Sequence, residues 1–319
     1  MTAHPPPHRL LLAPTVPPPL KVALRQIYPD SLNAGDRSEL DALAAAHAHD
    51  VTLFVTTATE GVSESQLVAL PQLRAVCSLG VGVDALDLDA AQRRGIAVSN
   101  TPDVLNDCVA DLAVGLLIDA ARGMSRADRA VRRGDWPRSG PGPLGTRVSG
   151  RRLGLLGMGR IGQTIARRLS GFDMDIRYHA RRPVQGLAHA HEPSLEALAE
   201  WADFLVVACA GGEATRGLVS APVLAALGPA GYLVNIARGS VIDEPALIAA
   251  LQNGTLGGAA LDVFADEPNV PAALMALDNA VLLPHVGSAT GQTRRAMGDL
   301  LMANIEAYVR TGALTTPAR

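Results

Sequence analysis

The stretch GLLGMGRIGQTIARRL contains three glycines at GxGxxG spacing, directly after an apolar run and at the start of a helical pattern. In that setting the first glycine allows a tight turn, the second lets the backbone approach a pyrophosphate and the third packs helix against strand. Free N–H groups at the helix start then bind the phosphates. The stretch predicts a dinucleotide loop, and glycines that serve only a tight turn are the alternative. The cofactor-binding residues expected there are Gly157, Met158, Gly159, Arg160, Ile161 and Gly162.

The second strand of this unit ends without a carboxylate. An NAD-binding unit places Asp or Glu about 20 residues after the loop, where it holds the ribose hydroxyls. Here the run YHARRP places Arg181 and Arg182 after Ala180. Guanidinium groups bind a phosphate through paired hydrogen bonds, whereas a carboxylate would repel it. We therefore expect Ala180, Arg181 and Arg182 to bind the 2′-phosphate of NADP(H), although a solvated arginine pair would have the same sequence.

Three charged or titratable residues follow strand-like runs in the second half of the chain. Arg238 follows YLVNIA, Glu267 lies in the turn behind GGAALDVF, and His285 ends AVLLPH. Ligands of open α/β sheets bind beyond the carboxyl ends of the strands. We therefore expect the three side chains to meet in one crevice beside the dinucleotide loop. Each residue taken alone could be a core histidine or a surface charge.

The elements that must position these residues alternate along the chain. Short apolar runs alternate with helical patterns, which is typical of parallel α/β sheets. The predicted strands cover 51–57 and 74–80 in a first series, then 151–157, 174–180, 204–210, 232–237, 257–264 and 280–285. The predicted helices include 63–70, 103–124 and 293–310, and the Pro/Gly-rich stretch 132–145 is expected to be a surface loop. We predict a dinucleotide-binding domain at 103–287 and a substrate (catalytic) domain made of 1–102 and 288–319.

Composition excludes several classes of function. The chain has 28 Lys plus Arg against 31 Asp plus Glu, a net charge of −3, which argues against nucleic-acid binding. No apolar run reaches the ~18 residues needed to span a membrane. The first twenty residues combine a short apolar patch with prolines and have no signal-peptide pattern. We interpret them as a disordered tail, with residues 1–8 of the substrate domain expected to be disordered, and we expect a cytoplasmic protein.

Cysteines and histidines give no sign of a metal site. The three cysteines form no CxxC pair and are expected to be reduced thiols. Two HxH pairs, His47/His49 and His189/His191, have no further ligand at metal spacing, so solvated histidines are the better interpretation.

At this point the chain resembles the D-isomer-specific 2-hydroxyacid dehydrogenase family, from about residue 45 to the end. The resemblance is closest to NADP-dependent glyoxylate/hydroxypyruvate reductases and hydroxyphenylpyruvate reductases. The motifs that carry it are LGVGVD, SNTPDVLNDCVADLAVGLL, GLLGMGRIG, NIARGSVIDEPAL, GGAALDVFADEP and LLPHVGS. The resemblance implies two doubly wound parallel-sheet domains, a Rossmann-type cofactor domain and a flavodoxin-like, discontinuous catalytic domain. It also implies a homodimer built mainly on the cofactor domains.

The family also implies a reaction, the reduction of a small 2-oxo acid to the 2-hydroxy acid with hydride from NADPH. Arg238 would grip the carboxylate and the carbonyl oxygen of the substrate. His285 would give a proton to the carbonyl, while Glu267 would hold the imidazole and keep it protonated. Backbone N–H groups of Val81 and Gly82 would take the substrate carboxylate. Ile236 and Asp262 would complete the cofactor site, with Asp262 holding the nicotinamide amide.

Other activities stay open at this stage. Hydroxyphenylpyruvate is a second substrate candidate beside glyoxylate and hydroxypyruvate. Some relatives are dinucleotide-sensing corepressors of the same fold, although the complete Arg–Glu–His set favours an enzyme. A methyltransferase also uses a glycine loop after its first strand but would not require that set.

Overall fold

A computed structural model describes residues 8–318, which form two compact units. Unit 1 consists of Met1–Leu105 and Thr290–Arg319, and unit 2 is Asn106–Ala289. The assignment of the substrate to residues 1–102 with 288–319, and of the cofactor to 103–287, stays a prediction.

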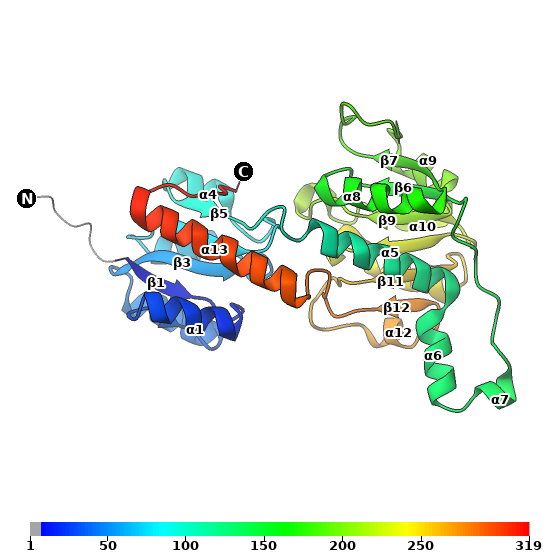
Figure 1. Cartoon of the computed structure of the whole chain (residues 1–319), viewed down its shortest axis with the longest axis horizontal. Helices are drawn as coiled ribbons and strands as arrows, with labels where there is room; N and C mark the ends of the chain where they lie inside the picture. Colours follow the sequence, from blue (N-terminus) through cyan, green and yellow to red (C-terminus); the bar gives the residue numbers. More distant parts are fainter. Residues whose placement is uncertain (1–7, 319) are drawn as a thin grey trace, which may run out of the picture. The chain divides into compact units, whose positions relative to one another are not determined.

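Unit 1 is built on a five-stranded parallel sheet (Figure 1). Its strands are β1 Arg9–Leu12, β2 Leu32–Asn33, β3 Val51–Thr57, β4 Ala75–Leu79 and β5 Ala97–Ser99. All seven residues of β3 are buried, as expected of an apolar, β-branched run in the middle of a parallel sheet. The strand order β2-β1-β3-β4-β5 is the flavodoxin-like order, so the predicted fold class is confirmed for this unit.

The helices of unit 1 come from both ends of the chain. They are α1 Pro18–Ile27, α2 Arg37–Ala46, α3 Glu64–Ala69, α4 Leu88–Arg93 and α13 Gly291–Thr311. The predicted helix at 293–310 is α13, which begins after the capping side chain of Thr290 and packs against β4. Because α13 packs against a strand from the first quarter of the chain, unit 1 is discontinuous in sequence.

The predicted disordered tail is wrong for the residues that can be checked. Residues 1–7 lie outside the described residues. His8 is described, and its Nδ1 lies 3.2 Å from the hydroxyl oxygen of Thr52. The apolar patch Arg9–Leu12 is the buried strand β1. The prolines that follow do not break structure, because Pro18 occupies the first turn of α1, where a missing N–H costs no hydrogen bond.

Unit 2 contains a seven-stranded parallel sheet. Its strands are β6 Arg152–Leu156, β7 Asp175–His179, β8 Ala190–His191, β9 Phe204–Val207, β10 Tyr232–Asn235, β11 Gly258–Leu261 and β12 Ala280–Leu282. The order β12-β11-β10-β9-β6-β7-β8 reverses between β6 and β9, which is the Rossmann arrangement. A reversal of this kind opens a crevice at the carboxyl ends of the strands, where β6 leads into the glycine loop.

Helices cover both faces of this sheet. The helices of unit 2 are α5 Asn106–Arg122, α6 Met124–Arg132, α7 Trp136–Ser139, α8 Arg160–Leu169, α9 Leu195–Trp201, α10 Ala221–Leu227, α11 Glu244–Gln252 and α12 Ala272–Met275. Short 3₁₀ turns lie at η1 Ser170–Phe172, η2 Glu213–Thr215 and η3 Gly239–Val241. Leu205 and Val207 belong to the core formed with α9, α10 and α11. Their neighbours Phe204 and Val206 point to the other face, where α5 packs along α8 and over β10, β11 and β12.

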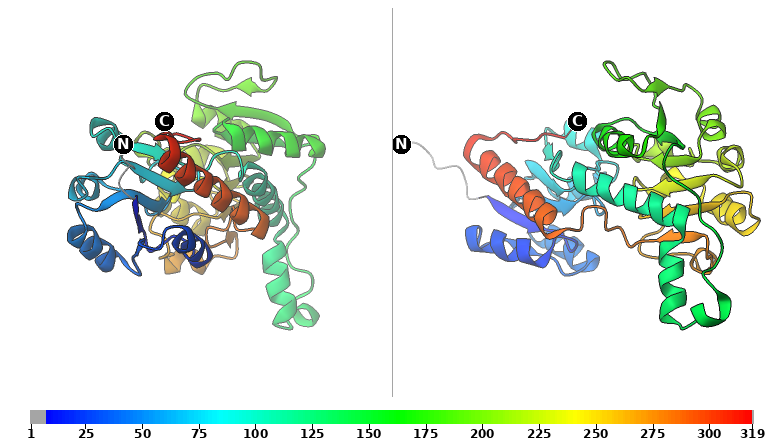
Figure 2. Two further views of the ribbon diagram at one scale, coloured as in Figure 1. Left: turned by 60° about the vertical axis from the view of Figure 1, so that its left-hand side comes forward. Right: turned by 45° about the vertical axis from the view of Figure 1, so that its right-hand side comes forward.

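The predicted helix at 103–124 is shorter than expected. It ends at Arg122, because Gly123 adopts φ +61° and starts a new helix, α6. Figures 1 and 2 show α6 and α7 extending from the end of α5, beyond the sheet of unit 2. The predicted surface loop 132–145 therefore contains a short helix, α7. None of the helices formed by residues 8–318 is long and apolar enough to cross a membrane.

Candidate functional site

The glycine loop joins β6 to α8 and uses its three glycines differently. Gly157 has φ +101°, and a Cβ there would lie 2.6 Å from the backbone nitrogen of Cys209. A Cβ on Gly162 would lie 2.2 Å from the carbonyl oxygen of Gly157. At Gly159, no heavy atom lies within 4 Å of an added Cβ. The first and third glycines therefore close the turn, and the second leaves open space in front of the backbone.

The start of α8 completes this loop. Gly159 caps the helix without a side-chain hydrogen bond, and no acidic residue lies in the first turn. N–H groups of a first helical turn have no acceptor within the helix and carry a partial positive charge. Met158 is buried, and its carbonyl accepts a 3.1 Å hydrogen bond from the side-chain amide of Gln163. The loop fits a pyrophosphate, and Gln163 is a support that the glycine spacing alone did not reveal.

The arginine pair follows β7, the neighbour of β6 in the sheet. Arg181 and Arg182 are exposed. Among residues 8–318, no ion pair or hydrogen bond involves either guanidinium group. The amide of Gly157 donates a 2.9 Å bond to the carbonyl of His179, which ties the glycine loop to the end of β7. Two cationic side chains thus stand at the strand end next to the glycine loop.

His285 and Glu267 are in direct contact. His285 Nδ1 lies 2.6 Å from Glu267 Oε2, and Glu267 Oε1 accepts a 3.0 Å bond from the amide of Phe264. Burial acts to raise the pKa of Glu267, but the hydrogen bond and charge of His285, the amide of Phe264 and the charge of Arg238 lower it overall. The carboxylate is therefore ionised at neutral pH and accepts the proton that His285 presents at Nδ1.

The backbone holds His285 in an unusual conformation. His285 has φ +54°, a left-handed value that a residue with a Cβ rarely adopts. Its amide donates to the carbonyl of Asp262, and the Asp262 carboxylate accepts from the amides of Val286 and Gly287 at 2.7 and 2.8 Å. Asp262 is 2% exposed, and burial raises its pKa despite these hydrogen bonds. The sequence suggested a cofactor ligand at Asp262, and the structure adds that this side chain fixes the turn of His285.

Arg238 follows β10 at the same edge of the sheet. Its Nη1 donates a 2.8 Å bond to the carbonyl of Ala237, and its own carbonyl accepts from the side chain of Asn235. The charge of Arg238 contributes to the lowered pKa of Glu267, so the three predicted residues share one electrostatic environment. Ile236, between strand and arginine, is buried.

Two further residues support this arrangement and were not predicted. A Cβ on Gly239 would lie 1.9 Å from the carbonyl carbon of Phe264, so the loop after β10 touches the loop that carries Glu267. The carboxylate of Glu244 accepts a 3.1 Å bond from the amide of Ala265 in that second loop. Close approach of this kind requires glycine, which a sequence reading could have suspected from its place beside Arg238.

The predicted substrate loop belongs to unit 1 and follows β4. Val81 and Gly82 are half-buried and come after Gly80, which has φ +130°. The hydroxyl of Thr101 bonds to both the amide and the carbonyl of Gly80, at 2.9 and 3.2 Å. The side-chain amide of Asn100 donates a 2.9 Å bond to the carbonyl of Val81. The loop is therefore fixed by side chains of the segment after β5.

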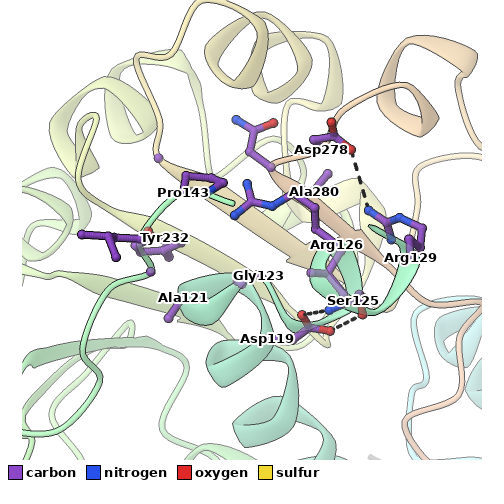
Figure 3. A pocket seen from close by; sticks show the side chains of 16 residues that line it. Asp119, Ala121, Gly123, Ser125, Arg126, Arg129, Pro143, Tyr232, Asp278 and Ala280 are labelled. Atoms are coloured by element: carbon purple, nitrogen blue, oxygen red, sulfur yellow. Dashed lines mark hydrogen bonds and ion pairs between the residues drawn. The ribbon is translucent and has the colours of Figure 1, made fainter. Parts of the chain in front are cut away.

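A pocket in unit 2 lies away from the predicted site residues of that unit (Figure 3). It is lined by the end of α5, the start of α6, residues 143–145 and residues near the amino ends of β10, β11 and β12, whereas the predicted site residues of unit 2 follow the carboxyl ends of its strands. Figure 3 shows Asp119 accepting hydrogen bonds from Ser125, and Arg129 pairing with Asp278 at 3.9 Å. No predicted site residue lines this pocket.

The described residues contain neither a cluster of metal ligands nor a disulfide. Within residues 8–318, no three His, Cys, Asp or Glu side chains gather as a metal site would require. Cys77, Cys108 and Cys209 are free, and burial raises the pKa of both Cys77 and Cys209 to about 11. These two buried thiols are protonated at neutral pH and are poor nucleophiles.

Comparisons with known proteins agree with this geometry. Residues 114–287 match the family described as D-isomer specific 2-hydroxyacid dehydrogenase, NAD binding domain. The chain is 45% identical to a glyoxylate/hydroxypyruvate reductase A of Arabidopsis thaliana, over 88% of this chain and 89% of the relative. It is 44% identical to a hydroxyphenylpyruvate reductase of Plectranthus scutellarioides, over 86% and 87% of the two chains.

A solved structure resembles the chain over nearly its whole length. It is an NADPH-dependent glyoxylate/hydroxypyruvate reductase from Sinorhizobium meliloti, in complex with NADP and malonate, with a TM-score of 0.92 and 42% identity. The match covers 98% of this chain and 97% of the other. With a Rossmann unit, a flavodoxin-like unit and relatives of this identity, the chain belongs to the D-isomer specific 2-hydroxyacid dehydrogenase family.

Proposed function

We propose that this protein is an NADP(H)-dependent reductase that converts a small 2-oxo acid, glyoxylate or hydroxypyruvate, to the 2-hydroxy acid. The observation that carries the proposal is the 2.6 Å contact between His285 and Glu267, in the unit that also holds the glycine loop. A paired imidazole at the carboxyl edge of a dinucleotide-binding sheet is suited to proton transfer beside a bound cofactor. Relatives named as glyoxylate/hydroxypyruvate reductases, at 45% and 42% identity, support the substrate class.

The proton would come from Nε2 of His285. Because the Glu267 carboxylate accepts at Nδ1, the other ring nitrogen is the one that exchanges a proton with a carbonyl oxygen. Reduction requires a proton on Nε2 as well as the proton on Nδ1 that the Glu267 carboxylate accepts as a hydrogen bond. In the reverse direction, the neutral ring would accept the proton of the 2-hydroxy group.

Arg238 would orient the substrate. Its planar guanidinium can bind a carboxylate oxygen and the neighbouring carbonyl oxygen together. The amides of Val81 and Gly82 would bind the substrate carboxylate, since a glycine-containing turn exposes its N–H groups to an anion. This loop supports the assignment of residues 1–102 and 288–319 as the substrate domain.

The cofactor role belongs to residues 103–287. When bound, NADPH supplies the hydride. Arg181 and Arg182 would bind its 2′-phosphate, because no carboxylate stands at the end of β7 to repel it. The amides of the glycine loop, from Gly157 to Gly162, would bind the pyrophosphate. Ile236 and Asp262 would contact the nicotinamide half.

Hydroxyphenylpyruvate is a second substrate candidate, because the relative that is 44% identical carries that name. A panel of 2-oxo acids at fixed NADPH, followed by loss of NADPH absorbance, tests both candidates. We expect turnover of glyoxylate and hydroxypyruvate, and at least a tenfold higher kcat/KM with NADPH than with NADH. No turnover of any 2-oxo acid would favour a dinucleotide-sensing protein without catalysis.

We also infer a homodimer formed through the segment of α6, α7 and the loop after them. Met124, Val131, Trp136 and Leu144 are each more than half exposed, and apolar groups of this size are usually covered by a partner. In analytical ultracentrifugation, Val131→Glu should shift the protein toward the monomer. Val68→Glu, at an equally exposed valine of α3, should leave the dimer intact.

The free cysteines are consistent with the predicted cytoplasmic location.

A further inference from the structure

We propose that Tyr178 and His191 are positioning residues that set the preference for NADPH, by fixing the backbone on both sides of Arg181 and Arg182. This inference rests on the proposed binding of the 2′-phosphate by the arginine pair. It concerns two side chains that do not themselves carry the charge that would select the cofactor.

Tyr178 fixes the chain after the pair. It is the fourth residue of β7 and is 2% exposed, so its ring belongs to the core of unit 2. Its hydroxyl oxygen accepts a 2.8 Å hydrogen bond from the amide of Val184. Val184 stands two residues beyond Arg182, and Pro183 between them has no N–H of its own. The buried hydroxyl is therefore the anchor for this side of the loop.

His191 fixes the chain before the pair. Its Nε2 lies 2.9 Å from the carbonyl oxygen of Ala180, the residue that precedes Arg181. A carbonyl oxygen can only accept, so Nε2 carries the proton and donates it. The edge strand β8 brings His191 opposite Tyr178, and the two rings meet edge-on with centroids 5.2 Å apart.

His179 completes this ring cluster. Its Nδ1 donates a 2.9 Å bond to the carbonyl of Glu192, and its ring stacks on His191 with centroids 6.4 Å apart. The carbonyl of Tyr178 in turn accepts a 2.7 Å bond from the amide of Glu192. Beside the pairing of β7 with β8, two bonds to Glu192 hold the end of the edge strand against β7, one from the side chain of His179 and one to the backbone of Tyr178.

Fixing the backbone matters because the two arginine side chains are exposed and flexible. Ordering a long side chain on binding costs conformational entropy, and a mobile loop would add the cost of ordering its backbone. Because Ala180 and Val184 are already held by hydrogen bonds, the backbone of the loop needs no further ordering when the phosphate binds. NADH has no 2′-phosphate, so its affinity should not depend on the two anchors.

The test measures the dissociation constants of NADPH and NADH without a 2-oxo acid, by isothermal titration calorimetry. Tyr178→Phe removes the acceptor for Val184, and His191→Phe keeps an aromatic ring while removing the donor to Ala180. Each variant should raise the dissociation constant of NADPH by about fivefold, the value expected for one lost hydrogen bond, and leave the dissociation constant of NADH unchanged. Tyr232→Phe is the matched control, since its hydroxyl bonds to Thr146 at the other end of the sheet, and it should change neither constant.

The double variant Arg181→Ala with Arg182→Ala separates this inference from the proposed function. If the double variant loses the NADPH preference, adding Tyr178→Phe to it should weaken the binding of NADPH no further, because the two arginine side chains that the loop positions are gone. An unchanged affinity ratio in Tyr178→Phe and His191→Phe, beside a lost preference in the arginine variant, would overturn the positioning role alone. Equal weakening of NADPH and NADH would also overturn it, since it would indicate a general loss of structure. A preference that survives removal of both arginines would instead refute the proposed phosphate site.

Discussion

His285 Nδ1 and Glu267 Oε2 lie 2.6 Å apart, although the two residues follow different strands of the sheet. The second oxygen of Glu267 is held by the amide of Phe264, and the backbone of His285 is held by Asp262. Turning the carboxylate away would break the bond from Phe264, and the backbone turn that carries the imidazole is fixed by Asp262. The pair is a fixed feature of the edge at which β11 and β12 end, and it determines which ring nitrogen is available for chemistry.

The first prediction concerns the pH dependence of this pair. Because the pKa of Glu267 is lowered, its carboxylate stays charged to a more acidic pH than a free glutamate and keeps accepting the hydrogen bond from Nδ1 of His285. This bond orients the ring, so kcat/KM for reduction should be full at neutral pH and fall only in the acidic range, as the pH falls through the ionisation of Glu267. Oxidation of the 2-hydroxy acid uses the same oriented ring and should lose its rate over the same acidic range.

Glu267→Gln removes the charge and keeps a hydrogen-bonding shape. Its kcat/KM for reduction should be lower than that of the unmodified enzyme at neutral pH, and its pH profile should lack the acidic limb that the ionisation of Glu267 produces. His285→Gln should lose ~10²–10⁴-fold of the rate at every pH. The same acidic limb in the two pH profiles, with chemistry limiting the rate, would show that Glu267 does not position His285.

The second prediction concerns the substrate anchor. Arg238→Lys keeps the charge but replaces a planar fork with a point charge, which cannot bind a carboxylate and a carbonyl oxygen in the same way. We expect kcat/KM for the 2-oxo acid to fall by ~10²-fold or more, with the dissociation constant of NADPH little changed. Near-normal turnover by this variant would mean that Arg238 has a structural role.

Periodicity and strand ends made much of the fold predictable. Each predicted strand of the second series contains an observed strand, but the runs extend too far at their carboxyl ends. The run 204–210 becomes Phe204–Val207, and 280–285 becomes Ala280–Leu282. Most of the surplus residues are apolar or small, yet they leave the sheet, and several of the loops that they form carry predicted site residues. A pattern of apolar residues cannot distinguish these two uses.

Contacts between distant segments could not be predicted from the sequence. The bonds of Asp262 to the turn of His285 depend on a backbone conformation with φ +54° that no local signal announces. Tyr178 stands at a position where the strand pattern predicts a buried apolar side chain. The partner of its hydroxyl, the amide of Val184, depends on the path of the loop, which the sequence does not reveal. The amino-terminal strand was misread for a related reason, because prolines suggested disorder where one of them begins a helix.

The third prediction tests the spacing between two catalytic loops. An added Cβ on Gly239 would lie 1.9 Å from the carbonyl carbon and 2.0 Å from the carbonyl oxygen of Phe264, so backbone must move. Phe264 begins the loop of Glu267, and Gly239 follows Arg238. Gly239→Ala should therefore lower kcat/KM by ~10²-fold, the effect of a displacement of about 1 Å.

Gly115→Ala is the matched control for this substitution. Gly115 lies in α5, an added Cβ there meets no atom within 4 Å, and alanine favours the helix by about 1 kcal/mol. It should leave turnover unchanged and raise the melting temperature slightly. Equal turnover in Gly239→Ala and Gly115→Ala would show that the close approach has no bearing on catalysis.

The last prediction concerns Asn100 and the loop proposed to bind the substrate carboxylate. The carbonyl of Val81 and the amide of Gly82 belong to one planar trans peptide and point in opposite directions. The 2.9 Å bond from the side chain of Asn100 to that carbonyl therefore also sets the direction of the Gly82 N–H. The carbonyl of Asn100 is held in turn by the hydroxyl of Thr316, at 2.6 Å, so the carboxyl-terminal segment supports the loop.

Asn100→Ala should raise the KM for the 2-oxo acid by roughly tenfold, the effect of losing about one well-placed hydrogen bond to an anion. The dissociation constant of NADPH should stay unchanged, because the loop belongs to unit 1 and the proposed cofactor residues to unit 2. Asn279→Ala removes a similar bond, from Asn279 to the carbonyl of Leu251, at the amino end of β12 and should leave the KM as it was. Steady-state kinetics with glyoxylate, together with titration of NADPH, separate the two effects. An unchanged KM in Asn100→Ala would mean that the orientation of this peptide does not limit substrate binding, and a loss of NADPH affinity would mean that the substitution disturbs more than the loop.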